Sequence, residues 1–143
     1  MTCQSDIENV AAQKILDAEC LLLGGRFDGA YYLAGYAIEL LLKAKICKTL
    51  GIADFFDFDN KDRSVKIKND NSVFRTHNYE QLLILSGIYM DYKNEQNPEF
   101  KANWSIVAEW NENSRYLINR TSQECIIFVE SVKEIIKWIR PHL

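Results

Sequence analysis

The sequence from Arg26 to Ala44 reads RFDGAYYLAGYAIELLLKA, and this stretch decides the fold. Its apolar side chains recur at helical spacing, but they occupy nearly the whole circumference of the helix that they predict. A helix that is apolar on all sides lies in the centre of a bundle or faces a partner on its second side. We expect this helix to begin with Asp28 as its N-cap and to end at Leu50, because Gly51 follows.

Two capping-box patterns, each a Ser or Thr followed three positions later by Glu, predict further helices at Ser5–Leu23 and at about Thr121–Ile139. Both segments carry an apolar stripe at helical spacing. Gly24 and Gly25 end the first of them, and Pro141 ends the last. These two helices therefore have one face to bury against the central helix.

Two more helices are predicted between the central and the last one. One begins near Thr76–Asn78 and continues to the polar stretch Lys93–Asn97. The next opens with Asn97 as N-cap and Pro98 at the first helical position, and its apolar pattern reaches Trp110. A polar segment, Asn111–Ser114, interrupts it.

Residues 52–74 break the helical rhythm, and we expect a long loop there with a short strand at Ser64–Lys68. The whole chain, residues 1–143, then forms one domain. The predicted fold is all-α, an antiparallel, up-and-down bundle of about five helices.

Composition excludes several classes of protein. With 143 residues, 48% of them hydrophobic, and a net charge of -3, the chain is typical of globular domains and unsuited to broad adhesion to nucleic acid. Met1–Glu8 lacks the pattern of a secretory signal, and Glu39, Lys43 and Lys45 interrupt the longest apolar stretch, so we expect a cytoplasmic protein with no membrane span. Four scattered cysteines and two histidines predict reduced thiols and no metal site or other cofactor.

The central helix resembles the signature helix of HEPN domains, the "higher eukaryotes and prokaryotes nucleotide-binding" superfamily. The match includes Glu39 and Lys43, which fit a Glu-x-x-x-Lys pattern. His77 with Leu82 resembles the family's His-x-x-x-x-Leu element at the start of the third helix, and Arg115-Tyr116 resembles its Arg-Tyr element before the last helix. The likeness covers nearly the whole chain.

The resemblance implies an all-helical bundle, commonly a homodimer, that cleaves RNA, binds a nucleotide or small ligand, or partners a small nucleotidyltransferase. Many members act in toxin-antitoxin or phage-defence systems. Cleaving members carry Arg-x(4–6)-His, in which histidine moves a proton and arginine binds phosphate. Here Arg120, Thr121 and Ser122 stand where that histidine would follow Arg115. Arginine cannot act as a base at neutral pH, so the sequence predicts no catalytic residue of this kind.

The candidate ligand or phosphate site consists of Glu39, Lys43, His77, Arg115, Tyr116 and Arg120. Glu39 and Lys43 project to the same side of a helix because they are four residues apart. The alternative interpretation of each is a surface ion pair, an ordinary surface arginine or a histidine that hydrogen-bonds at a helix start.

We therefore expect a HEPN-like binding domain for a nucleotide, an RNA or a partner protein such as a nucleotidyltransferase. One alternative is a divergent ribonuclease toxin in which His77 or Glu39 replaces the missing base. Another is a structural subunit with no ligand, which is favoured if Glu39, Lys43 and Arg115 lie far apart.

Overall fold

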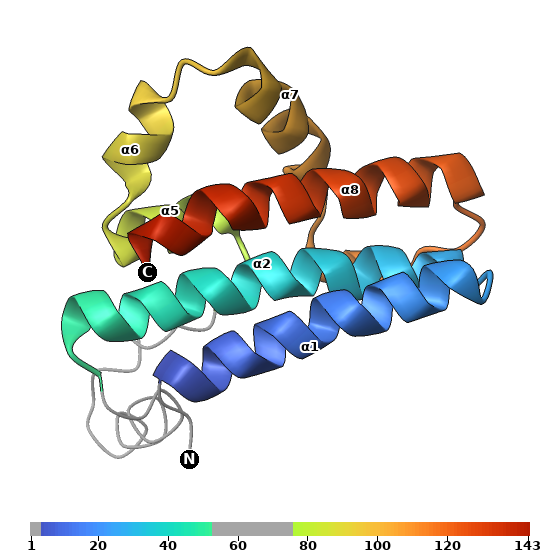
Figure 1. Ribbon diagram of the computed structural model, residues 1–143, viewed down its shortest axis with the longest axis horizontal. Coiled ribbons are helices and arrows are strands. Elements are labelled where there is room, and N and C mark those ends of the chain that lie inside the picture. Colours follow the sequence, from blue (N-terminus) through green and yellow to red (C-terminus); the bar gives the residue numbers. More distant parts are fainter. Residues whose placement is uncertain (1–3, 53–75) are drawn as a thin grey trace.

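A computed structural model describes residues 4–52 and 76–143. Every regular element in these two ranges is helical, so the predicted all-α fold is confirmed (Figure 1). The long loop expected at 52–74, with its strand at Ser64–Lys68, lies outside the described residues apart from Ile52.

Six α-helices and two short 3-10 helices make up the described part of the chain. They are α1 (Gln4–Leu23), α2 (Phe27–Leu50), α5 (Tyr79–Ser86), α6 (Tyr89–Asn94), α7 (Pro98–Val107), η1 (Glu112–Tyr116), α8 (Ser122–Ile139) and η2 (Arg140–His142). The single helix expected between residues 76 and 92 is in fact α5 and α6. Gly87 separates them because it adopts the left-handed conformation, at a φ of 84°, and caps α5.

Helix α2 lies in the centre of the bundle, where α1, α5, α8 and η1 all pack against it. Its side chains Ala34, Ile38 and Leu42 are completely buried. The chain therefore covers most of its own most apolar helix. No helix in the described ranges is long and apolar enough to span a bilayer.

The directions of the helices follow from contacts at both ends of α2. Helices α1 and α2 are antiparallel, whereas α8 runs in the same direction as α2 (Figure 1). At the start of α2, the Asp28 carboxylate accepts hydrogen bonds from the backbone N–H groups of Asn119 and Arg120, at 3.0 and 3.1 Å. At its end, Lys48 donates to the Leu143 carbonyl. The intervening helices α5–α7 return the chain to the first end before α8 begins.

The structure confirms two predicted helix starts and corrects two others. The side chains of Asn97 and Thr121 accept the expected capping hydrogen bonds, from Glu99 N–H and Glu124 N–H. Helix α2 begins at Phe27 without a side-chain cap, so the assignment of Asp28 as N-cap was wrong. The Asp28 carboxylate instead accepts hydrogen bonds from the backbone of the loop before α8. Helix α1 already includes Gln4, so Ser5 lies inside it.

Trp110 leaves the helix in which the sequence placed it and packs directly on the backbone of α2. Helix α7 ends at Val107. The indole of Trp110 lies so close to Gly35 that a Cβ there would be 2.2 Å from its Cδ1 atom. Trp110 Nε1–H donates to the Tyr32 carbonyl at 3.2 Å, and the Tyr79 hydroxyl donates to the Gly35 carbonyl at 2.7 Å. Gly35 thus permits the indole ring to lie against the helix.

Gly35→Ala is expected to destabilise the protein by about 1–3 kcal/mol, because the added methyl group overpacks a site that has no room for it. Gly29→Ala is the matched control in the first turn of the same helix. There a Cβ meets only the end of the Leu21 side chain, at 3.3 Å, and alanine favours helix. Urea unfolding followed by circular dichroism measures both. Equal stability of the two variants would contradict the close packing at Gly35.

Candidate functional site

The site is built on Glu39, a carboxylate in the middle of the central helix that is 0% exposed. Its Oε1 atom accepts a hydrogen bond from Lys43 Nζ at 2.7 Å and lies 2.8 Å from His77 Nδ1. Lys43 follows Glu39 by one turn of α2, whereas His77 comes from the segment before α5. The second oxygen, Oε2, is buried and meets no donor among the described residues. Only one of the two carboxylate oxygens therefore has hydrogen-bond partners among the described residues. Burial of a charged group is costly unless other groups compensate it, so the fold depends on the contacts of Oε1.

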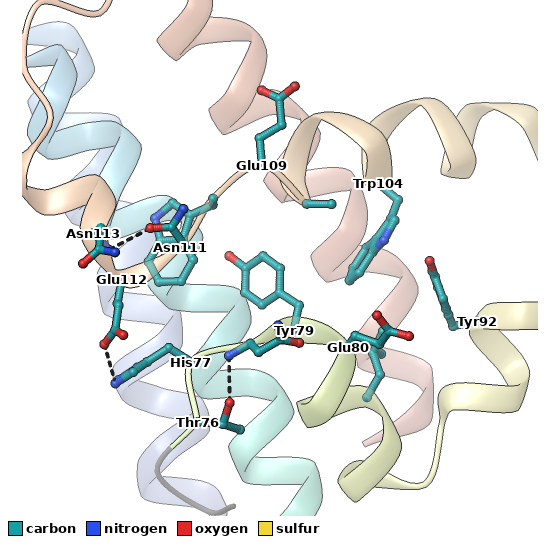
Figure 2. Close-up of a pocket in the computed structure, with 14 residues that line it drawn as sticks. Thr76, His77, Tyr79, Glu80, Tyr92, Trp104, Glu109, Asn111, Glu112 and Asn113 are labelled. Carbon is teal, nitrogen blue, oxygen red and sulfur yellow. Dashed lines mark hydrogen bonds and ion pairs between the residues drawn. The ribbon is translucent and has the colours of Figure 1, made fainter.

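His77 lies between two carboxylates. Its Nε2 atom is 3.1 Å from Glu112 Oε2 (Figure 2), whereas its other ring nitrogen, Nδ1, contacts Glu39. The contact of Nδ1 with Glu39 is a hydrogen bond, and the contact of Nε2 with Glu112 is within ion-pair distance. His77 thus links α2 to η1 through contacts with Glu39 and Glu112.

Local capping sets the positions of His77 and Glu112. The Asn78 side chain accepts a hydrogen bond from Gln81 N–H and starts α5, which fixes the residue just before it. Asn111 and Ser114 form a reciprocal capping box around the first turn of η1. Glu112 is the first residue of that turn. The sequence thus presents His77 and Glu112 from two helix starts that face each other.

A cavity of about 660 Å³ opens beside His77, between α5, α6, the end of α7 and η1. Its volume is within the range of small-ligand pockets. Its lining consists of Thr76, His77, Asn78, Tyr79, Glu80, Leu83, Tyr92, Trp104, Ala108, Glu109, Trp110, Asn111, Glu112 and Asn113. In Figure 2, His77 and Glu112 lie on one side of this pocket and Trp104 and Tyr92 on the other, with Tyr79 between them.

Four aromatic rings form a continuous wall of the pocket. Tyr79 stacks on Trp110 with 5.4 Å between ring centroids and lies 5.9 Å from Trp104, which in turn lies 5.1 Å from Tyr92. Burial raises the pKa of the Tyr79 hydroxyl well above its ordinary value, and the negative charge of Glu39 raises it further. The hydroxyl therefore stays protonated at neutral pH and keeps its hydrogen bond to Gly35.

The six residues singled out in the sequence fall into three groups. Glu39, Lys43 and His77 are in contact. Arg115 and Tyr116 form a separate exposed pair on η1, with the guanidinium 4.8 Å from the ring centroid. The phenol of Tyr116 raises the pKa of Arg115 by accepting a hydrogen bond from it.

Arg120 lies at the far end of the central helix. Its guanidinium stacks over Tyr31, 3.8 Å from the ring centroid, and its Nη1 atom is 3.7 Å from Asp28 Oδ1. The rise of 1.5 Å per residue puts Tyr31 and Glu39 about 12 Å apart along the helix axis. Arg120 thus belongs to the junction between α2 and α8 and not to the cluster at Glu39.

Sequence reasoning missed Glu112 and the aromatic wall. Glu112 lies 35 positions from His77 and follows no spacing rule that links the two. The aromatic residues could have been noticed, because Tyr92, Trp104 and Trp110 stand in a stretch rich in Asn and Glu, where large rings are unexpected. Their convergence depends on α6 and α7 folding back over α5, which the sequence pattern does not specify.

Comparison of the chain with protein-family models, curated proteins and solved structures gives no match. The assignment of a function therefore depends on the geometry and on the resemblance in the sequence. Within residues 4–52 and 76–143, no group of three or more His, Cys, Asp or Glu side chains is arranged to hold a metal ion.

Glu39→Ala is expected to lower the free energy of unfolding by about 2 kcal/mol, because the largely buried Lys43 loses a charged hydrogen bond, whereas the partly exposed His77 can be hydrated. Glu39→Gln keeps one acceptor oxygen and should lose less. Glu134→Ala is the matched control, since it breaks a 2.9 Å pair with Lys137 on an exposed face of α8. That change should cost less than about 0.5 kcal/mol. A loss in Glu39→Ala as small as in Glu134→Ala, in urea unfolding, would show that the cluster does not stabilise the core.

Proposed function

We propose that this chain is a HEPN-type binding domain that has no ribonuclease activity. The observation that carries this proposal is the position of His77 between Glu39 and Glu112. A general base must offer an unprotonated nitrogen to its substrate, but both ring nitrogens of His77 face carboxylates of the protein. The guanidinium of Arg115, which would bind phosphate in a cleaving member, lies over Tyr116 instead.

The contact of Glu39, Lys43 and His77 supports the resemblance, because these residues come from two of the three elements on which it rests. The pocket beside His77 supports a binding role. Of the partners proposed from the sequence, a protein such as a nucleotidyltransferase fits the pocket better than a nucleotide or an RNA. Three glutamates line it and would repel a phosphate group. A role in a toxin-antitoxin or phage-defence system follows from the resemblance alone.

The two alternatives fare differently. A ribonuclease that uses Glu39 as its base is opposed by burial, since a side chain with no exposed surface cannot reach an RNA. A ribonuclease that uses His77 would first have to release it from Glu112. A structural subunit with no ligand is opposed by the pocket beside His77. It is favoured by the position of Arg115, which pairs with Tyr116 and not with Glu39 or Lys43.

Purified protein is expected to leave a labelled single-stranded RNA intact in the presence of EDTA, because no side chain of the site is placed to accept the ribose proton. The assay follows RNA length by gel electrophoresis, with a metal-independent ribonuclease as positive control. Cleavage that persists through purification and disappears in His77→Ala or Arg115→Ala would overturn the proposed function. Cleavage that is equal in both variants and in the wild type indicates a contaminant, and a further purification then decides the question.

We also propose that the chain forms a homodimer, as the resemblance implies. Most of the apolar circumference of α2 is buried by its own chain, so this feature gives the proposal little support. Support comes instead from Tyr116, Leu117 and Ile118, three consecutive apolar residues that are 69%, 53% and 74% exposed. Contiguous exposed apolar surface is typical of an interface.

Light scattering at micromolar concentration should give the mass of two chains. Replacing Leu117 and Ile118 by Ser should give the mass of one chain, because the change removes apolar contact area without touching the core. Leu23→Ser, at a 92% exposed position on α1, is the control and should leave the mass unchanged. A monomeric wild type would refute the dimer.

A further inference from the structure

The pocket beside His77 combines a wall of aromatic rings with negative charge. Trp104 and Tyr92 are half-buried, whereas Tyr79 and Trp110 are buried. Such rings offer a π face to a ligand, and the face of tryptophan attracts cations most strongly. The aromatic wall alone would also suit a nucleobase or an apolar group.

The charged side chains decide between these ligands. Glu80, Glu109 and Glu112 line the pocket, and His77 is the only basic side chain among the lining residues that the structure describes. His77 is itself held by the carboxylates of Glu39 and Glu112. No Lys or Arg belongs to the described lining, so nothing there would neutralise a phosphate. The pocket therefore attracts positive charge and repels negative charge.

We propose that this pocket binds an organic cation, a guanidinium or alkylammonium group, against the faces of Trp104 and Tyr92. The inference rests on the proposed function as a binding domain and names the chemistry that the site recognises. A free diamine or guanidine carries such a group, and so does an Arg or Lys side chain of a partner protein. The carboxylates of Glu80, Glu109 and Glu112 provide the negative potential that attracts the cation.

The test uses n-butylguanidinium as the probe and n-butylurea as its neutral isostere, with the full-length wild-type chain. Nuclear magnetic resonance can follow the three indole N–H signals, of which those of Trp104 and Trp110 report on the pocket. Trp138 lies on α8 outside the pocket and is the internal reference, identified by Trp138→Phe. Butylguanidinium should shift the two pocket signals and bind at least about tenfold more tightly than butylurea, because only the cation gains from the rings and carboxylates.

Two charge variants locate the site. Glu80→Gln with Glu109→Gln should weaken butylguanidinium binding at least about fivefold, because it removes two of the three negative charges among the described lining residues. Glu124→Gln with Glu130→Gln makes the same change in net charge on α8, outside the pocket, and should alter binding less than about twofold. Glu112 is left intact, so the contact with His77 is undisturbed.

A second arm distinguishes the sources of the cation. The peptide acetyl-Gly-Arg-Gly-amide should bind, and its citrulline counterpart should not. Tighter binding of the peptide than of butylguanidinium supports a protein partner, and tighter binding of the free probe supports a small cation. Equal binding of butylurea, tighter binding of adenosine monophosphate, or the same affinity in both double variants would overturn the proposal. The RNA cleavage assay is independent of these results, so failure here leaves the proposed function standing.

Discussion

The buried charge of Glu39 is the constraint on which the rest of the site depends. An ionised carboxylate in a bundle core is tolerated only when other groups compensate its lost hydration. Lys43 does so from one turn along the same helix, and His77 does so from a segment 38 residues away. Glu39 Oε1 needs a partner, and this need holds the segment before α5 against the central helix through His77. Because His77 also contacts Glu112, the same need positions η1.

Gly35 has the complementary role one turn earlier on α2. The absent side chain lets Trp110 lie on the helix backbone, and Tyr79 reaches the Gly35 carbonyl from α5. Both rings belong to the aromatic wall of the pocket beside His77. Polar contacts at Glu39 and close packing at Gly35 thus hold the same two segments against α2, the one at the start of α5 and the one that leads into η1. The pocket lies between these segments and α6.

The all-α fold, the central position of α2 and most helix ends could be predicted because they depend on local spacing and on capping residues such as Asn97 and Thr121. The pair of Glu39 and Lys43 could be predicted for the same reason. His77 was singled out only through a resemblance. Its contact with Glu112 depends on tertiary packing, which the sequence pattern does not specify. Asp28 shows why local patterns can mislead. It is a common capping residue, but its carboxylate accepts hydrogen bonds from the backbone N–H groups of Asn119 and Arg120, more than 90 positions away.

Helix α6 has a thermodynamic consequence for the pocket. It contributes Tyr92 to the pocket wall, yet none of its six residues is buried. A segment with so little buried surface opens at a lower free energy than the bundle, through local fluctuations that leave α1, α2 and α8 folded. The amide hydrogens of α6 therefore exchange with solvent ahead of those in α2. A ligand held against Tyr92 would slow that exchange, because its binding energy is added to the closed state alone.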